Sequence, residues 1–170
     1  MKKLILYLLV LFAAFAILGF SREFIFVNIN NQLYNLYYGY NDAPIPASLH
    51  FITAYSYETL YYAKYPLTIL YAVLYFLTTY LAVRYMTADK KFGRWAVYIY
   101  ALLLILSGIV MAWGYFVNHR LDNEEYSFSR WVMGIAQSPL VAFFLLASSG
   151  LYTHLNTTKQ SPYEKRDRDL

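Results

Sequence analysis

The stretch WAVYIYALLLILSGIVMAWGYFV, residues 95–117, decides the fold class, because it contains no Asp, Glu, Lys, Arg or His. A helix of this length crosses the hydrocarbon core of a bilayer, which is roughly 30 Å thick. The segments 4–20, 65–83 and 131–153 are also apolar and free of ionisable side chains. Since a backbone in lipid must satisfy its own hydrogen bonds, each is expected to be helical. The sequence predicts an all-α integral membrane protein, a four-helix bundle.

The composition supports a membrane protein. Hydrophobic residues make up 59% of the chain and charged residues 14%, against about 45–50% and about 25% in soluble domains. The chain has no cysteine, which excludes disulfides, thiolate metal sites and cysteine nucleophiles. Its net charge of +4 is explained by basic residues at the cytoplasmic ends of spans. We therefore expect lipid and protein partners and no nucleic acid.

The basic residues predict the orientation. If the N-terminus is cytoplasmic, the inner segments carry ten of the 14 Lys and Arg: Lys2, Lys3, Arg84, Lys90, Lys91, Arg94, Lys159, Lys165, Arg166 and Arg168. Cytoplasmic segments of membrane proteins are enriched in such residues. The sequence thus predicts both ends of the chain on the cytoplasmic side.

The outer loop, residues 21–64, mixes aromatic and apolar residues with asparagines. Its spacing is not cleanly helical, so we interpret it as a partly helical interfacial segment. Residues 39–42 predict a turn, and 44–46 an extended stretch. A helical pattern resumes near Ser48, and Pro66 is expected to kink or restart that helix.

The two ends of the chain differ in character. Residues 1–155 form the predicted membrane domain, and the charged tail 156–170, which contains Pro162, is expected to be disordered. Lys2 and Lys3 before an apolar run are also typical of a signal peptide. The 17-residue length of that run favours a retained anchor.

No pattern in the sequence indicates catalysis. The spans lack the ionisable residues that mark proton and ion pathways. His119 and His154 fall on opposite sides of the membrane and His50 lies in the outer loop, so we predict no haem. His50 and His119 share a side and could form a surface metal site, but solvated histidines at the membrane surface explain them better. Ser148–Gly150 is not a nucleophile elbow. We expect no catalytic residue, cofactor or metal ligand.

Several residues are candidates for a partner or ligand surface. Arg22, Glu23 and Arg130 are charges at the outer ends of spans, explicable as headgroup contacts. Tyr71 and Tyr75 belong to a hydroxyl-rich face of span two, which serves helix packing or a lipid or quinone headgroup. The fourth span contains Gln137, Ser138 and Pro139. Pro139 should bend this helix, and Gln137 or Ser138 can satisfy the freed carbonyl.

Small residues mark a second possible contact surface. Gly108 and Ala112 in span three, and Gly134, Ser138 and Ala142 in span four, recur every four positions. Such stripes let helix backbones approach closely. They serve either packing within the protein or docking of a partner, and the sequence leaves both open.

Short motifs resemble a known family. These are Arg22–Phe26 after span one, Lys90–Lys91, Ser129–Trp131 and Gln137–Leu140. The layout resembles the small four-span proteins associated with exosortases, in particular the exosortase F system-associated group of Gram-negative bacteria. The tail after span four is longer than in that group. The resemblance implies a location in the bacterial inner (cytoplasmic) membrane and a membrane protein partner, possibly an exosortase.

Two functional hypotheses follow. The first is a non-catalytic accessory subunit of a bacterial inner-membrane sorting or export system, acting through helix–helix and periplasmic-face contacts. The alternative is a small lipid- or quinone-binding membrane enzyme or carrier that uses the charged residues of the outer face. The alternative predicts a cavity between spans two and four.

Overall fold

A computed structural model describes residues 2–39, 42–87, 89–116 and 123–166 of the protein. This part of the chain is helical and contains no strand. Its elements are α1 (Lys2–Tyr38), the 3-10 helix η1 (Ala47–Ala54), α2 (Tyr57–Met86), α3 (Lys91–Phe116), α4 (Asn123–Ala136) and α5 (Leu140–Arg166). Three of the described helices are long and apolar enough to cross a membrane, and a fourth span results if α4 and α5 count as one bent span.

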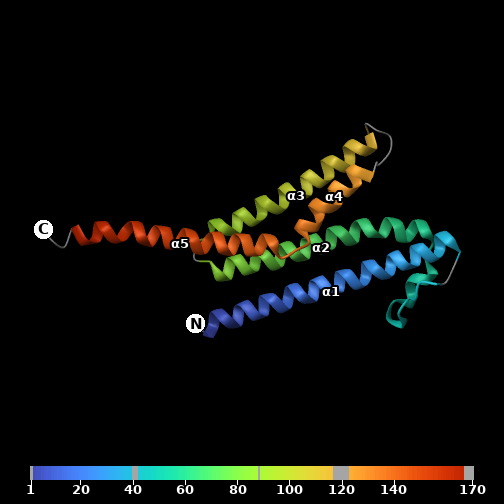
Figure 1. The fold of residues 1–170 in the computed structure, drawn as a ribbon, viewed down its shortest axis with the longest axis horizontal. Coiled ribbons are helices and arrows are strands. Elements are labelled where there is room, and N and C mark those ends of the chain that lie inside the picture. Colours follow the sequence, from blue (N-terminus) through green and yellow to red (C-terminus); the bar gives the residue numbers. More distant parts are fainter. Residues whose placement is uncertain (1, 40–41, 88, 117–122, 167–170) are drawn as a thin grey trace.

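The helices pack closely in one half of the molecule and diverge in the other. The first and last described residues lie toward the same end as the α2–α3 connection, and we call this the termini end (Figure 1). The C-terminal ends of α1 and α3 and the N-terminal ends of α2 and α4 lie at the opposite end, where α3 and α4 separate from α1 and α2 (Figure 1). The main core joins the helices before they diverge and includes Phe15, Tyr75, Val83, Tyr100 and Leu145.

Helix α1 is longer than the sequence analysis predicts. It continues without a break through residues 21–38, so the predicted end of the first helix at residue 20 is wrong. No strong helix breaker occurs there before Gly39, whose positive φ of 70° ends the helix. At about 1.5 Å per residue, α1 is about 55 Å long. It therefore extends well beyond one bilayer core.

The outer part of α1 has its own small core. Ile29 and Leu33 pack there with Ile52 of η1 and Leu60 of α2. Near the end of α1, Asn35 donates from Nδ2 to the Ala43 carbonyl at 2.8 Å, and its Oδ1 accepts from the Ala43 N–H at 3.0 Å. Asn35 therefore attaches the connection to the helix, and the segment from residue 21 to Tyr38 is helical where we expected a partly helical interfacial loop.

Helix α2 begins eight residues before the predicted span. Ser56 caps it by accepting a hydrogen bond from the Thr59 N–H, as N-terminal serines commonly do. Pro66 lies inside the helix, which runs on to Met86. Of the two outcomes predicted for Pro66, a kink or a restart, the restart is wrong, because α2 continues through it without a break.

The predicted fourth span is bent at the expected place. Helices α4 and α5 meet at an angle of 50°. The break contains Pro139, and the Ser138 hydroxyl donates to the Ile135 carbonyl at 2.8 Å, so the role predicted for Ser138 is confirmed. Helix α4 begins at Asn123, ahead of the expected start of the span. Helix α5 runs to Arg166, so the described part of the tail is helical where we expected disorder.

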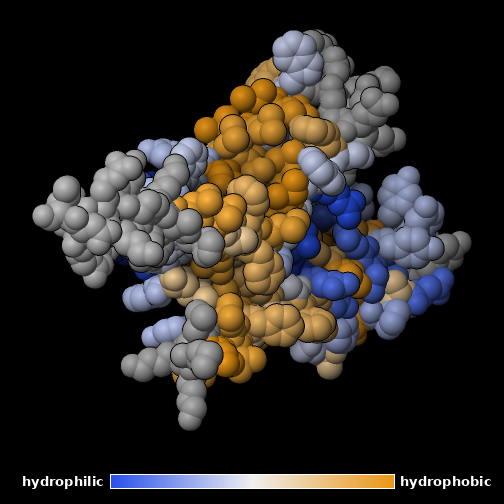
Figure 2. Space-filling view, turned by 60° about the vertical axis from the view of Figure 1, so that its left-hand side comes forward, coloured by the Kyte–Doolittle hydropathy of each residue, from blue (hydrophilic) through white to orange (hydrophobic). Residues whose placement is uncertain are grey.

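The surface is suited to lipid. Large hydrophobic side chains are exposed along α1, α2, α3 and α5, among them Phe12, Leu70, Leu102 and Phe144. Figure 2 shows a broad hydrophobic surface with hydrophilic side chains gathered beside it. In water this surface would drive aggregation, whereas a bilayer solvates it. The protein is thus a membrane protein in contact with lipid.

Candidate functional site

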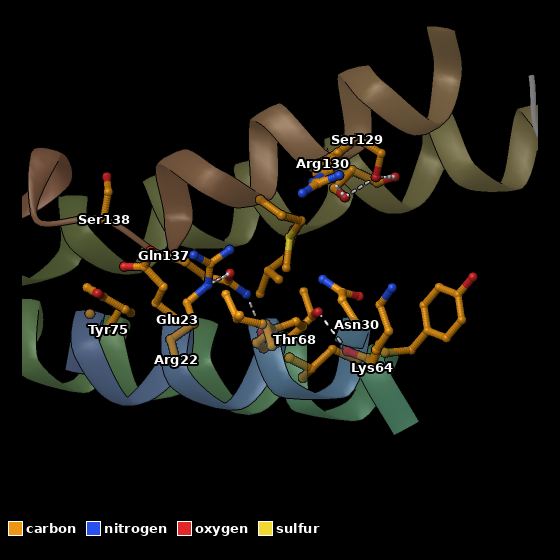
Figure 3. A pocket seen from close by; sticks show the side chains of 18 of the residues that line it. Arg22, Glu23, Asn30, Lys64, Thr68, Tyr75, Ser129, Arg130, Gln137 and Ser138 are labelled. Atoms are coloured by element: carbon orange, nitrogen blue, oxygen red, sulfur yellow. Dashed lines mark hydrogen bonds between the residues drawn. The ribbon is translucent and has the colours of Figure 1, made fainter. Parts of the chain in front are cut away.

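The principal feature of the described structure is a cleft between the diverging helix pairs. Its volume is about 1460 Å³, and its walls come from α1 and α2 on one side and from α3, α4 and the α4–α5 break on the other. Polar side chains from both sides face into it (Figure 3). The polar and charged residues that line it are Arg22, Glu23, Asn30, Tyr61, Lys64, Tyr65, Thr68, Tyr75, Ser107, Ser129, Arg130, Gln137 and Ser138.

The cleft is positively charged. Arg22, Lys64 and Arg130 contribute three cations, and Glu23 contributes one carboxylate. These charges come from α1, α2 and α4, which are distant in sequence. Among the residues that the structure describes, none of the four forms an ion pair. Lys64 lies 5.9 Å from the centroid of the Tyr61 ring, a cation–π contact. The four charges leave a net charge of +2 in a cleft with apolar walls, which favours an anion.

Gln137 joins three parts of the structure. Arg22 of α1 donates from Nε to Gln137 Oε1 at 2.6 Å, and Gln137 donates from Nε2 to the Thr68 carbonyl of α2 at 2.6 Å (Figure 3). The Gln137 side chain is buried. Arg22 also lies over the Phe26 ring, 5.5 Å from its centroid. Gln137 therefore connects the α4–α5 break to both helices of the opposite wall.

The break in the fourth span explains why Gln137 is available for this role. Its backbone N–H still completes the last turn of α4 by donating to the Met133 carbonyl. Pro139 cannot donate a backbone hydrogen bond, so the helix does not continue past it. The sequence analysis offered Gln137 or Ser138 as the partner of the freed carbonyl. Ser138 makes that local bond, and the Gln137 side chain reaches across to α1 and α2.

A pair of serines holds the other wall together. Ser107 of α3 and Ser129 of α4 are both buried, and their hydroxyl oxygens lie 2.6 Å apart. Ser129 also lies within hydrogen-bond distance of the Ser107 carbonyl, at 3.3 Å. Small residues permit close approach of membrane helices, and buried hydroxyls stabilise it. This contact fixes α4 against α3 and so positions Arg130, the residue after Ser129.

The cations lie one membrane thickness from the N-terminus of α1. Twenty residues separate Lys2 from Arg22, a rise of about 30 Å along a helix. This equals the thickness of the hydrocarbon core. If Lys2 lies at one membrane surface, Arg22 lies close to the other. The charged part of the cleft then faces the headgroups at the membrane surface opposite Lys2.

The structure brings most of the predicted surface residues together. Arg22, Glu23, Tyr75, Arg130, Gln137, Ser138 and Pro139 all line the cleft. Tyr71 does not line it: this residue is buried and donates from its hydroxyl to Ser21 Oγ at 3.2 Å. Tyr71 therefore takes the packing role that the sequence analysis left open.

The sequence analysis missed three polar residues of the cleft, Asn30, Ser107 and Ser129, as parts of a site. Asn30 fell within the segment interpreted as an interfacial loop. Extending the helical register of span one as far as Gly39 would have placed Asn30 two turns after Glu23, near the same face.

No metal site is evident in the part of the chain that the structure describes. Within it, no three His, Asp or Glu side chains gather in a way that could hold a metal ion. Of the residues considered for a surface metal site, His119 and Asp122 lie outside the described residues.

Comparisons with known proteins identify no relative. The chain matches no family model, no curated protein and no solved structure. The resemblance to exosortase-associated proteins therefore stays a prediction, and the geometry of the cleft carries the functional argument.

Proposed function

We propose that the protein binds an anionic amphiphile, with the anionic group in the charged part of the cleft and the apolar part against its hydrophobic walls. The proposal rests on one observation: three cations and one carboxylate, without ion-pair partners among the described residues, face a cleft between lipid-exposed helices. Charges at such a position are costly unless a ligand or solvent compensates them. A bound anion provides this compensation.

The chemistry of the lining favours a phosphate-type headgroup. Arginine binds phosphate through a planar fork of donors, and lysine adds a mobile point charge. Arg130 and Lys64 approach the cleft from opposite walls (Figure 3). Next to them, Ile69, Leu104 and Met111 form apolar walls that can cover acyl or isoprenoid chains. This is the lipid-binding hypothesis, with the carrier form favoured over the enzyme form.

Native mass spectrometry of the protein released from lipid nanodiscs tests the proposal. The cleft of the wild-type protein should retain one anionic lipid in preference to phosphatidylcholine. Lys64→Gln and Arg130→Gln should each lower this retention about fivefold, because each basic residue contributes about 1 kcal/mol to binding at an anionic surface. Lys91→Gln is the matched control, since Lys91 carries the same charge and does not line the cleft. Equal retention in all three variants would contradict the proposal.

A second candidate function, that of the accessory subunit, has separate support. Gly108 of α3 and Gly134 of α4 have open space where a side chain would begin: an added Cβ would meet nothing within 4 Å. Gly108 lines the cleft, and Ala142 is buried in the main core, so Gly134 is the position at which a helix of a partner could approach closely. Under this proposal the partner belongs to a bacterial inner-membrane sorting or export system, as the exosortase resemblance implies.

Affinity purification of the native membrane complex separates the two functions. An accessory subunit should retain a stoichiometric protein partner, and Gly134→Leu should release it without loss of the protein. Purification of the chain alone in gentle detergent, with a bound lipid, would exclude the accessory role and support the amphiphile-binding role.

A further inference from the structure

We infer that the protein has a second anion site, which binds the phosphate headgroup of an anionic phospholipid at the termini end of the molecule. A pocket of about 440 Å³ lies there between the end of α2 and the beginning of α3. It is lined by Tyr80, Arg84, Lys90, Gly93, Arg94 and Val97. None of these residues lines the large cleft, so the second site is independent of the function proposed above.

The pocket concentrates positive charge. Arg84 comes from the last turn of α2, Lys90 is the residue before α3, and Arg94 lies in the first turn of α3. No acidic residue lines the pocket, and within the described structure none of the three cations forms an ion pair. Three cations on two facing helix ends present a ready partner for a phosphate group.

The acidic residue nearest in sequence is occupied elsewhere. Asp89 accepts a hydrogen bond from the Lys91 N–H at its Oδ1, at 2.8 Å, and its backbone carbonyl accepts from the Phe92 N–H. This carboxylate therefore caps the start of α3. Asp89 does not line the pocket, so a phosphate group in the hollow would not share it with a carboxylate.

A glycine and a tyrosine shape the pocket. Gly93 is buried, and a Cβ added to it would lie 3.4 Å from Cε2 of the Tyr80 ring. The ring thus lies close against the backbone of α3, and the absence of a side chain at Gly93 keeps the two helices near each other. The three cations are exposed, and they converge around a hollow that Tyr80, Gly93 and Val97 also line.

The surroundings indicate a lipid as the source of the phosphate. Tyr85, Trp95 and Tyr98 are exposed around this end of the molecule, and aromatic rings at helix ends typically lie at the headgroup level of a bilayer. Val97, which lines the pocket, is also exposed and continues onto the apolar surface of α3. A headgroup in the pocket could therefore extend its acyl chains along a lipid-facing helix. Basic pockets between membrane helices commonly bind anionic headgroups.

The test uses full-length protein in phosphatidylcholine nanodiscs with and without phosphatidylglycerol, and counts retained lipids by native mass spectrometry. Lys64→Gln/Arg130→Gln is the background, so that lipid in the large cleft does not contribute. Arg84→Gln, Lys90→Gln and Arg94→Gln should each lower retention of one phosphatidylglycerol about fivefold. Lys91→Gln is the control, because this neighbour of Lys90 removes the same charge from the same hairpin without lining the pocket.

Three results would overturn the inference. The first is equal retention of phosphatidylglycerol and phosphatidylcholine by the background protein. The second is a loss with Lys91→Gln as large as the loss with Lys90→Gln, which would indicate a general charge effect. The third is full displacement of the lipid by millimolar inorganic phosphate, which would assign the pocket to the free anion. Circular dichroism of each variant confirms that the helices remain folded.

Discussion

Replacement of Gln137 by leucine should destabilise the protein more than any other single change at the cleft. Leucine is close in size to glutamine but cannot accept from Arg22 or donate to the Thr68 carbonyl. Both of these bonds are 2.6 Å long and join different helices. Interhelical hydrogen bonds in membranes contribute on average about 0.6 and at most about 1.7 kcal/mol each. The Arg22 Nε that loses its partner adds a desolvation cost of about 1 kcal/mol or more.

The sum predicts a loss of about 2–4 kcal/mol in the free energy of unfolding of Gln137→Leu. Titration of the purified protein with sodium dodecyl sulfate in mixed micelles, followed by circular dichroism, measures this quantity. Gln137→Glu should fall between the leucine variant and the wild type. Its carboxylate still accepts from Arg22 but cannot donate to the Thr68 carbonyl.

Ser138→Ala is the matched control, because it removes a neighbouring hydrogen bond that stays within the break. That serine donates only to the local Ile135 carbonyl, so its loss should cost about 1 kcal/mol or less. If Gln137→Leu unfolds at the same denaturant concentration as Ser138→Ala, Gln137 does not connect the two walls, and the reasoning from the hydrogen bonds is refuted.

Three further predictions concern the polar contacts that support the cleft. Thr79→Val and Tyr100→Phe should each lower the free energy of unfolding by about 1–2 kcal/mol, because each leaves a buried hydroxyl without the partner that lies 3.0 Å away. The double variant should lose less than the sum of the two single losses, and strict additivity in the same titration would contradict a direct bond. Ser107→Ala should weaken the contact between α3 and α4 by about 0.6–1.7 kcal/mol. It should also broaden the distribution of distances between spin labels on α4 and α1, and an unchanged distribution would show that the Ser107–Ser129 contact does not hold α4 in place. Asn35→Leu should speed hydrogen exchange at the Ala43 amide, since Asn35 is its acceptor, and unchanged protection would show that the connection is held by other contacts.

Hydropathy sufficed to predict the helical class and the membrane-length segments, because the cost of unpaired backbone in lipid leaves few alternatives to a helix. The position of the bend was also predictable, since Pro139 removes a backbone donor. The end of α1 was predicted wrongly. Polar residues after Phe20 were interpreted as a loop, although no strong helix breaker precedes Gly39. Loss of hydrophobicity marks the edge of the membrane, and it need not mark the end of a helix.

The cleft itself could be predicted only in part. The outer charges were recognisable as a group, because Arg22, Glu23 and Arg130 follow or precede spans. Their convergence with Lys64 depends on how far α3 and α4 diverge from α1 and α2. The position of Arg130 depends further on the contact of Ser107 with Ser129, which holds α4 against α3. No local pattern encodes such a pairing.

Site-specific photocrosslinking in native membranes tests the central claim most directly. A photoreactive amino acid at Met133 would lie in the wall of the cleft, whereas one at Phe144, which is exposed on α5 and does not line the cleft, would sample bulk lipid. We predict that Met133 captures a single class of anionic amphiphile, with the yield lowered by Arg130→Gln, while Phe144 captures lipids in proportion to their abundance. Capture of a protein at Met133, or of the same lipid mixture at both positions, would contradict the proposed function.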